Sequence, residues 1–557
     1  MLPPRIVWKT IYRKPPDSVF MAQYDVVIIG GGHNGLASAC IMARNGLKVL
    51  VLERREIVGG MCATEEIFSG FSYDTGCFYP YWLRQDTVDE LRLSKHGLEF
   101  IDSGGIAYSA LFPDGRYLTV YEDAKKTGQE IEKFSRKDAQ SYLEFVTFWK
   151  RFRPVVDAFL LSPPPPLDLL TDIAKPLPVK VALLKLLGRL PPSVNKALDF
   201  LKEPENIEAL AEFFFKPMGA KLDELFESDY VKIALASESL VVSQSGPSSA
   251  PLSALVWRVI MKERTGRVRG GMGNFPLALK KAAEDAGARI LVNAEVERVI
   301  VKDRVARGVK LKNGEEIESR IVASNADPHR TFLGLVGQEH FDDRTLKRIM
   351  KYRLVSTGLR LNYALSRKPS FAIPDEKLVG ALTYCPSLDY AEKAFAEAAM
   401  GDPPSKPLLL LDVPTAADST LAPSGAHILQ SWVNPTVYEA RRGSWDTIKE
   451  SYADNLTHLI AESASNFENS ILHRFLQTPL DYERRFYATG GDVEHGDLSY
   501  YQLLWFRPIL GYYDGRTPIR NLYLVGSGIH PGGGVRALAG MIAARTILSD
   551  IESGRIA

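Results

Sequence analysis

Cysteine is scarce in this sequence, and the cysteines that are present follow no metal-binding or redox spacing. The chain has four of them, Cys40, Cys62, Cys77 and Cys385, and no CxxC pair. A redox dithiol motif is therefore absent, and the sequence predicts reduced thiols in a cytosol-like compartment.

Other signatures are missing as well. Neither sign of charge is in excess, since 68 Lys and Arg face 67 Asp and Glu for a net charge of +1, so no nucleic-acid partner is expected. No run reaches the roughly 18 apolar residues that a transmembrane helix needs. HExxH, GxSxG and clustered metal ligands are all absent, so no metal site is expected.

The N-terminal residues 1–20 carry four basic residues and one acidic residue, but no apolar segment of the kind a secretory signal requires. Two interpretations remain open. One is a basic targeting segment, which would place the protein in the mitochondrial matrix. The other is a plain extension of a cytoplasmic protein, with Met21 as an alternative start just before the first strand.

The rest of the composition is that of a globular protein. The chain has 557 residues, of which 45% are hydrophobic and 24% charged. Its length predicts roughly two to four domains. Residues 24–53 fit a βαβ unit, because YDVVIIG and LKVLVLE are continuous apolar runs, typical of parallel strands covered on both faces. A helix is expected between them, from about Asn34 to Asn45.

The turn of this unit reads GGGHNG and fits the pattern GxGxxG, with Gly30, Gly32 and Gly35 in the three glycine positions. In such a turn the first glycine allows the tight bend, the second lets the backbone approach a pyrophosphate, and the third lets helix and strand pack closely. The free N–H groups of the helix N-terminus hold the phosphates. Glu53, about 20 residues later, is expected to bind the adenosine ribose.

A Gly59-Gly60 pair follows Glu53 and Arg54. Such a pair lets the backbone run alongside an extended cofactor beyond its pyrophosphate, which a domain that binds only NAD does not need. FAD is therefore the expected cofactor, and an ordinary glycine turn is the alternative. His33 and Asn34, inside the fingerprint, are expected on the pyrophosphate side.

A second glycine-rich run, GSGIHPGGGVRALAG, follows the apolar strand NLYLVG near the end of the chain. It has no ribose-binding acid and no following strand, so we interpret it as the far end of the same FAD site. A helix beginning at these glycines would face the flavin, and its partial positive charge would stabilise the anionic reduced ring. The candidate cofactor contacts in this run are Gly526, Ser527, Gly533, Gly534 and Val535.

Several of these motifs resemble those of one family. YDVVIIGGGHNGL, ERREIVGGMCATEE, GFSYDTG and NLYLVGSGIHPGGGV are similar to the motifs of the phytoene desaturase-like FAD-dependent oxidoreductases. GGMG at 270–273 and DSTLAPSGAH at 418–427 resemble the branch that holds the carotene ketolases and pyridine nucleotide-disulfide oxidoreductase domain-containing protein 2. The resemblance covers residues 22 to 548 and is weakest between 85 and 260.

The resemblance implies an α/β fold, with a Rossmann-like FAD-binding domain of the glutathione reductase and amine oxidase type. A mixed β-sheet and a helical substrate domain are inserted into it. FAD would lie extended, with Val296 near the adenine and Asn325-Ala326-Asp327 returning to the cofactor. Many such flavoproteins place an acid after the last core strand, whereas this chain has Ser527 there.

The expected domains are discontinuous. The FAD-binding domain comprises residues 21–84, 265–330 and 490–557. Residues 85–264 form a helix-rich insertion, a candidate membrane or substrate-entry region, and 331–489 form the substrate domain.

For three groups of residues, two interpretations remain open. His530 either lines the flavin site as a catalytic residue or caps the helix. Arg536 either pairs with the cofactor or forms a structural salt bridge. The aromatic stretch from Tyr79 to Trp82 either walls the flavin or packs in the core.

The predicted function is hydride transfer between a flavin and an apolar, isoprenoid- or carotenoid-like small molecule. The stretch 175–192 is basic and apolar, which favours either peripheral membrane contact or packing on the protein itself. Two alternatives remain: a flavin-binding regulatory protein with low turnover, and an amine oxidase-like enzyme on a polar substrate. A cavity lined by aromatic residues and carboxylates would favour the latter.

Overall fold

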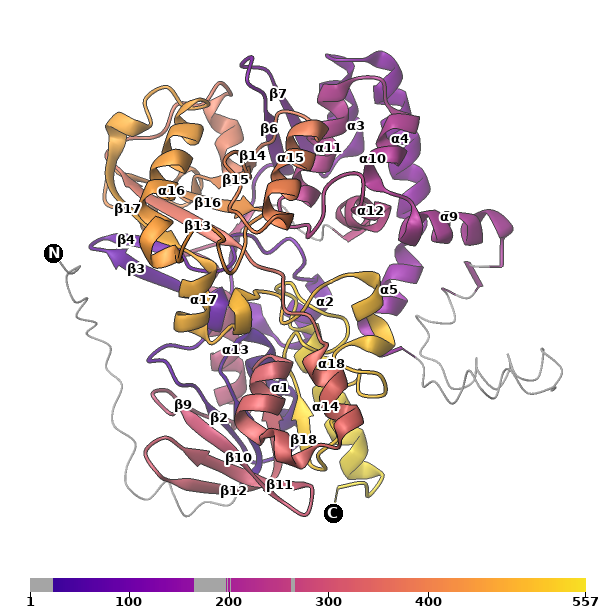
Figure 1. The fold of residues 1–557 in the computed structure, drawn as a ribbon, viewed down its shortest axis with the longest axis vertical. Coiled ribbons are helices and arrows are strands. Elements are labelled where there is room, and N and C mark those ends of the chain that lie inside the picture. The colour runs from indigo at the N-terminus through magenta and orange to yellow at the C-terminus, as the bar shows by residue number, and fades with distance from the viewer. Residues whose placement is uncertain (1–23, 165–196, 198, 201, 262–265, 557) are drawn as a thin grey trace.

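The computed structural model describes residues 24–164, 197, 199–200, 202–261 and 266–556. The predicted extension 1–20 and the basic apolar stretch 175–192 lie outside these residues. Figure 1 shows the described chain as a lower α/β part, an upper part built on a second sheet, and a group of helices beside that sheet.

The lower part is a Rossmann-type sheet centred on β1. As the sequence predicts, β1, α1 and β2 form a βαβ unit, and β1 pairs in parallel with both β2 and β12. β9 extends the parallel sheet beyond β2, and β18 extends it beyond β12. The strands of this sheet are β1 (Tyr24–Ile29), β2 (Val49–Leu52), β9 (Arg289–Leu291), β10 (Val296–Lys302), β11 (Val305–Leu311), β12 (Glu316–Ser324) and β18 (Leu522–Leu524).

The segment after residue 288 forms an antiparallel meander only in part. β10, β11 and the first half of β12 do form an antiparallel unit. β9 instead joins the parallel sheet beside β2, and the second half of β12 runs parallel to β1. β12 thus belongs to both arrangements, and its end delivers Asn325 to the carboxyl edge of the parallel strands, where such sheets bind ligands.

Three helices pack against this sheet: α1 (His33–Arg44), α13 (Asn274–Asp285) and α18 (Leu538–Glu552). α1 packs against both of the others. The last helix was expected to begin at the glycines of the C-terminal run. It begins at Leu538 instead. The residues between Gly526 and Ala537 form an irregular loop, and the positive φ of 63° at Ala537 turns the chain into the helix.

The second sheet has the order β17-β13-β16-β15-β14-β6-β7. Its strands are β6 (Ile106–Leu111), β7 (Tyr117–Tyr121), β13 (Leu359–Leu365), β14 (Ala381–Tyr384), β15 (Leu408–Asp412), β16 (His427–Asn434) and β17 (Ile471–Gln477). β6 and β7 come from the segment 85–264, which was expected to be helix-rich, so the second sheet draws on both insertions.

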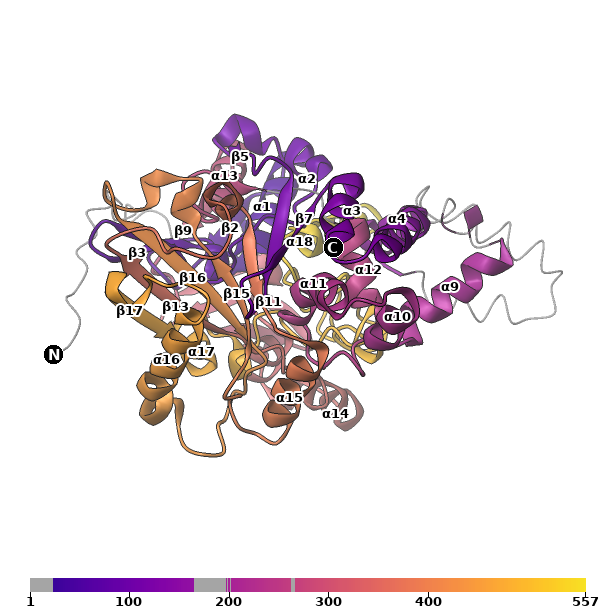
Figure 2. The same cartoon turned by 90° about the horizontal axis from the view of Figure 1, so that it is seen from above.

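The remaining helices lie around the second sheet or, as α2 and α14 do, beside the lower part (Figure 1), and Figure 2 shows α9 projecting from one side. They are α2 (Gln85–Glu90), α3 (Ala124–Glu132), α4 (Arg136–Lys150), α5 (Arg153–Leu161), α9 (Pro204–Phe215), α10 (Met218–Leu225), α11 (Asp229–Leu240), α12 (Leu252–Met261), α14 (Asp343–Met350), α15 (Leu388–Ala399), α16 (Trp445–Ala461) and α17 (Pro479–Phe486). Across the described ranges, no helix combines the length and apolar character needed to span a membrane.

A buried ion pair joins a small two-stranded ribbon to the second sheet. The ribbon pairs β5 (Phe100–Ile101) with β8 (Arg267–Val268), while β3 (Thr64–Phe68) pairs with β4 (Phe71–Asp74) in a separate hairpin. Arg267 of β8 donates to Asp412 of β15 at 2.8 Å, and their side chains are 4% and 0% exposed. The Tyr79 hydroxyl donates to the same carboxylate at 2.6 Å.

Because breaking a buried pair leaves an uncompensated charge, we expect Asp412→Asn to lower the free energy of unfolding by roughly 3–5 kcal/mol. Urea denaturation measures the change. The double variant Arg267→Met/Asp412→Leu removes both charges and is expected to recover most of the loss. Equal stabilities for Asp412→Asn and the wild type would contradict this role of the pair.

Candidate functional site

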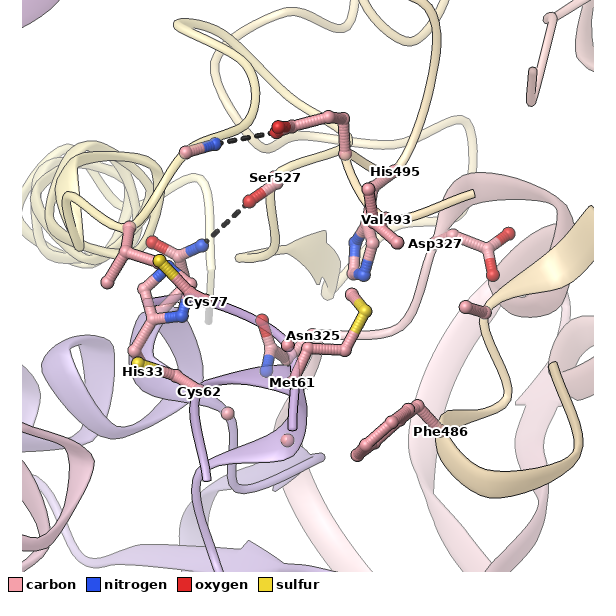
Figure 3. A pocket seen from close by; sticks show the side chains of 18 of the residues that line it. His33, Met61, Cys62, Cys77, Asn325, Asp327, Phe486, Val493, His495 and Ser527 are labelled. Carbon is pink, nitrogen blue, oxygen red and sulfur yellow. Dashed lines mark hydrogen bonds between the residues drawn. The ribbon is translucent and has the colours of Figure 1, made fainter. Parts of the chain in front are cut away.

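A cavity of about 360 Å³ lies between the two sheets. It extends from the β1–α1 turn, past the end of β12, to the second sheet and α11 and α12, and Figure 3 shows part of its wall. Predicted site residues in its lining are Gly30, Gly32, His33, Asn34, Glu53, Arg54, Gly59, Gly60, Val296, Ser527, Gly534 and Val535. The segments that the sequence analysis assigned to one extended cofactor thus meet in one cavity.

The fingerprint glycines have the geometry that a dinucleotide requires. Gly30 has a φ of +96°, which favours glycine. A Cβ built on Gly35 would lie 2.4 Å from the Gly30 carbonyl oxygen, so this glycine serves helix–strand packing behind the cavity wall. No side chain caps the N-terminus of α1, and no acidic residue lies in its first turn. Its free N–H groups suit a phosphate.

The Glu53 carboxylate is buried at the end of β2 and is held by backbone donors. Gly31 N–H donates to Oε2 and Arg55 N–H donates to Oε1, each at 2.8 Å. Each ionised carboxylate oxygen has a further lone pair, which leaves capacity for ribose hydroxyl groups. The residue predicted to bind the ribose is therefore fixed in orientation.

The Gly59-Gly60 pair runs beside the fingerprint. Gly59 N–H donates to the Gly31 carbonyl at 2.9 Å, and Gly59 has a φ of +113°. A Cβ on Gly60 would approach the Cα of Gly32 to 3.6 Å. Two backbone segments without side chains thus border the cavity where a pyrophosphate and its ribityl extension must pass.

The cysteines near this segment are not a redox pair. Cys62 and Cys77 both line the cavity, and both are free thiols. Burial raises the pKa of both thiols, that of Cys77 to about 12. Because only thiolates are good nucleophiles, these groups are unreactive at neutral pH.

An arginine–tyrosine stack closes the end of the cavity near Val296. The Arg54 guanidinium lies 3.8 Å from the ring centre of Tyr487, and that of Arg330 lies 3.9 Å from it. The Tyr487 hydroxyl donates to Glu295 at 2.7 Å. Neither Arg330 nor Tyr487 belongs to a sequence motif, so the sequence did not indicate them. Tyr487 follows α17 with a left-handed φ of 57°, a conformation that its sequence context does not predict.

The end of β12 returns to the fingerprint as the family resemblance implies. Asn325, Ala326 and Asp327 line the cavity. Asn325 N–H donates to the Ile29 carbonyl at 2.8 Å, which continues the pairing with β1. A Cβ on Gly32 would lie only 2.7 Å from Asn325 Nδ2, so these elements leave no room for a side chain.

Asn34 joins the fingerprint to the C-terminal run. Its Nδ2 donates to Ser527 Oγ at 3.1 Å, and its Oδ1 accepts from Gly540 N–H at 3.3 Å (Figure 3). Ser527 lines the cavity at the position where related folds place an acid. The serine hydroxyl therefore serves first as the acceptor that orients Asn34.

The glycines of the C-terminal run divide into two groups. Gly534 and Val535 line the cavity, whereas Gly526 and Gly533 lie behind its wall. Gly534 N–H donates to Glu494 Oε2 at 2.7 Å (Figure 3), and a Cβ on Gly533 would lie 1.5 Å from that oxygen. Glu494 was not expected at the site, and burial raises its pKa.

Of the two interpretations of His530, the structure favours the structural one, because the residue does not line the cavity. The residue is fully buried outside the cavity lining, and its Nε2 lies 2.5 Å from the Phe159 carbonyl oxygen of α5. Burial lowers the pKa of His530 to about 4, so the ring is neutral. It anchors the C-terminal loop to α5. His33 does line the cavity, and burial lowers its pKa to about 4 as well.

Aromatic residues wall the opposite end of the cavity. Tyr79 and Tyr81 stack with ring centres 4.6 Å apart, and Trp82 and Trp432 lie in the same lining. The aromatic stretch therefore packs in the core and borders the cavity at once. Burial raises the pKa of both tyrosines, so their phenols are not acids at neutral pH.

Charged side chains also reach this end. Glu238 of α11 and Arg258 of α12 line the cavity, with 3.9 Å between Glu238 Oε1 and Arg258 Nη1. Neither was expected, because both come from helices in the segment where the family resemblance is weakest.

A polar face of the second sheet adjoins the aromatic end. Arg360 lies opposite Trp432, and Asn362 lies opposite Gln430, in the pairing of β13 with β16. All four carry buried polar atoms without a hydrogen-bond partner, and the Arg360 guanidinium lies 3.7 Å from the Phe78 ring centre. A signal exists in the sequence of β13, since the polar residues Arg360 and Asn362 alternate with leucines in LRLN.

This donor set fits FAD. An uncapped helix N-terminus, two glycine segments without room for side chains and a fixed ribose-binding carboxylate lie along one cavity. No group of three or more His, Cys, Asp or Glu residues in the described chain is arranged to hold a metal ion. Fold and site together define an FAD-binding protein of the Rossmann type.

Comparison with known proteins identifies the family. The flavin containing amine oxidoreductase family matches residues 35–351. Pyridine nucleotide-disulfide oxidoreductase domain-containing protein 2 of Rattus norvegicus is 32% identical, over 98% of this chain and 97% of that protein. A limonene dehydrogenase chain of Castellaniella defragrans is 26% identical, over 95% of each chain. The neurosporene-forming phytoene desaturase of Cereibacter sphaeroides is 23% identical, over 92% of each.

The fold agrees with these relationships. An oxidoreductase from Methanosarcina mazei superimposes with a TM-score of 0.58 at 15% identity, covering 95% of this chain and 100% of that one. The chain belongs to the flavin-containing amine oxidoreductase family, and it is an FAD-dependent oxidoreductase. The resemblance stated from the sequence motifs is confirmed, and so is the FAD cofactor.

We expect Gly35→Ala to abolish FAD retention, because its Cβ would collide with the Gly30 carbonyl oxygen at 2.4 Å. The ratio of flavin to protein absorbance after purification measures this. Gly334→Ala is the matched control, since its Cβ would make only an ordinary 3.7 Å contact with Arg330. Full FAD content in Gly35→Ala would show that the turn is wrongly described.

His530 predicts a pH effect on stability. Its pKa falls from 6.5 to about 4 on folding, so between these values the unfolded chain binds the additional proton. Stability from this group is complete above pH 6.5 and is lost toward pH 4, by at most about 1.4 kcal/mol per pH unit.

His530→Gln should therefore lose less stability than the wild type between pH 7 and pH 5. Urea denaturation at several pH values gives the difference in free energy of unfolding between the two proteins. The buried carboxyl groups of Asp74 and Asp492, whose pKa values are raised to about 6, contribute equally to both proteins and cancel in this difference. Parallel pH curves for the two proteins would contradict a neutral, buried His530.

Proposed function

We propose that the protein transfers a hydride between FAD and a carbon atom of an apolar, isoprenoid- or carotenoid-like substrate. The observation that carries the proposal is the continuity of one cavity from the fingerprint to the aromatic wall. When bound, FAD supplies the hydride chemistry itself. The protein has to hold the cofactor, orient the substrate and exclude water.

Different residues along the cavity would carry out these tasks. The α1 N-terminus and Glu53 would hold the ADP half, and Gly534 and Val535 would border the flavin ring. Tyr79 and Tyr81 present buried aromatic faces, while their hydroxyl groups are bonded to Asp412 and the Ala107 carbonyl. Since these hydroxyls are bonded to protein partners, the two rings contribute carbon surface, and not free polar groups, to the cavity wall.

The names of two relatives support an apolar substrate, because limonene and phytoene are both hydrocarbons. In the proposed direction the substrate would be oxidised by two electrons: one hydrogen would leave carbon as a hydride to FAD, and a second would leave the neighbouring atom as a proton to water. Oxygen, a quinone or a nicotinamide cofactor then accepts the electrons.

An amine oxidase-like reaction on a polar substrate is the second candidate. Glu238 and Glu494 line the cavity together with aromatic residues, which is the lining expected for a cationic amine. Arg258 lies in the same lining, however, and Arg536 stands close behind it. The two arginines offset the two carboxylates, so the lining offers no excess of negative charge to a protonated amine, and the apolar substrate remains the favoured proposal.

Peripheral membrane contact through 175–192 is part of the proposal. Ile207 and Phe215 of α9, which follows this stretch in the sequence, are 55% and 73% exposed. Such residues would add to the binding of a basic apolar segment to a lipid surface. A cytoplasmic location with membrane association, or the mitochondrial matrix, would accommodate this contact.

The test is anaerobic reduction of the bound flavin by a panel of donors. We expect isoprenoid hydrocarbons or alcohols to bleach the flavin absorbance, and putrescine to leave it unchanged. NADH, NADPH and a quinone identify the second partner in the same experiment. Bleaching by amines alone would favour the second candidate, and protein that binds no FAD would refute both.

A further inference from the structure

A short turn in the last third of the chain, residues 492–497, carries an imidazole ring into the cofactor cavity. His495 of this turn lines the cavity, and Figure 3 shows its ring projecting toward the space above Met61. No hydrogen bond joins the ring to another residue in the described parts of the chain, and the buried Nδ1 has no partner. Because buried polar groups in proteins are normally bonded, the partner of this ring is to be sought in the occupant of the cavity.

The backbone at His495 is held in a conformation that residues other than glycine seldom adopt. Its φ is +55°, in the left-handed region. Asp492 Oδ1 accepts from the N–H groups of Glu494 and Gly496, each at 2.9 Å. The Tyr352 hydroxyl donates to the His495 carbonyl at 2.7 Å. Residues that their surroundings hold in this way concentrate at ligand sites, and here the turn fixes the direction of the ring.

One buried guanidinium places this turn beside the C-terminal run. Arg507 donates through Nη2 to the Glu494 carbonyl at 2.7 Å and through Nε to the Ser527 carbonyl at 2.9 Å. A Cβ on Gly528 would lie 3.7 Å from the His495 carbonyl oxygen. His495 therefore stands next to Ser527, the position where related folds place an acid, and both residues line the cavity.

The serine alone does not replace that acid. Ser527 Oγ already accepts from Asn34 Nδ2 at 3.1 Å, whereas a carboxylate would accept from several hydroxyl groups. Burial lowers the pKa of His495; Asp327 opposes this shift and Arg507 adds to it. The ring is thus neutral, with one acceptor nitrogen and one N–H donor. It supplies the acceptor that the serine lacks.

His530 shows what a histidine with a structural role looks like in the same region. Its Nε2 meets the Phe159 carbonyl oxygen, and it lies outside the cavity lining. His495 has the opposite arrangement, because its backbone is fixed by the protein and its ring is left for the cavity.

We propose that His495 binds the ribityl chain of FAD and takes the place of the missing acid. The cavity runs from the fingerprint, which would hold the diphosphate, to Gly534 and Val535, which would border the flavin ring. The ribityl chain has to span the part between them, and His495 enters that part from the side of Ser527. A ribityl hydroxyl donates to the acceptor nitrogen of the ring as it would to a carboxylate, and no additional charge is buried. This contact is needed whichever substrate class the protein takes.

The test is the affinity of the full-length apoprotein, prepared from the holoprotein, for FAD and for ADP. ADP shares the diphosphate with FAD but has no ribityl chain, and calorimetry measures both dissociation constants. We expect His495→Gly to weaken FAD binding about tenfold, as the loss of a hydrogen bond in a cavity implies, and to leave ADP binding unchanged. Because glycine adopts a positive φ without strain, the substitution removes the ring and keeps the turn.

Asp303→Gly is the matched control, because Asp303 has a left-handed φ of 51° in the exposed turn between β10 and β11. It should keep both affinities. Imidazole added to His495→Gly should restore most of the FAD affinity, since it fills the space that the ring leaves. His495→Asn tolerates the left-handed φ and keeps a donor and an acceptor on a shorter side chain, so it should lose part of the affinity. It tests the contact even if the glycine variant does not fold, which circular dichroism checks.

Full FAD affinity in folded His495→Gly would overturn the proposal. An equal loss of FAD and ADP affinity would overturn it too, because the ring would then serve the ADP half or the fold. A loss of FAD affinity that imidazole does not restore would give His495 a structural role and refute the contact. No substrate takes part in these measurements, so their outcome is independent of the proposed hydride transfer.

Discussion

The close approach of backbone segments around the β1–α1 turn is the constraint on which the rest of the structure depends. A Cβ on Gly35 would lie 2.4 Å from the Gly30 carbonyl oxygen, and one on Gly540 would lie 2.0 Å from that of Asn34. α1 can therefore sit close to β1 on one side and to α18 on the other. This packing brings the two ends of a long chain together and lets Asn34 bond Ser527 across the turn.

The same steric constraint explains which parts of the fold and of the site could be predicted from the sequence. The βαβ unit, the fingerprint glycines, Glu53 and the Gly59-Gly60 pair follow from local periodicity and from steric rules that act within a few residues. β6, β7, β14 and β17 were missed, because their pairing depends on partners far away in the sequence. Glu238, Arg258, Arg330 and Tyr487 carry no motif and reach the cavity only through tertiary packing.

The position of His530 shows why the sequence left two interpretations of this residue open. A histidine beside a proline and three glycines looks like a catalytic group, but its ring meets the Phe159 carbonyl of α5 and is closed off from the cavity. The position of a residue in the sequence does not determine to which side of a loop its side chain points. The alternating polar residues of β13 were a better signal, because the period of a strand does assign its faces.

The C-terminal loop therefore couples the two halves of the site. His530 fastens it to α5, Gly534 bonds Glu494, and the Arg536 guanidinium reaches over Trp82. One short segment thus lends backbone to the cofactor end and positive charge to the aromatic end. The arginines Arg258 and Arg536 and the carboxylates of Glu238 and Glu494 thus gather around the aromatic end. Aromatic surface and charges of both signs therefore meet where the C-terminal loop borders the cavity.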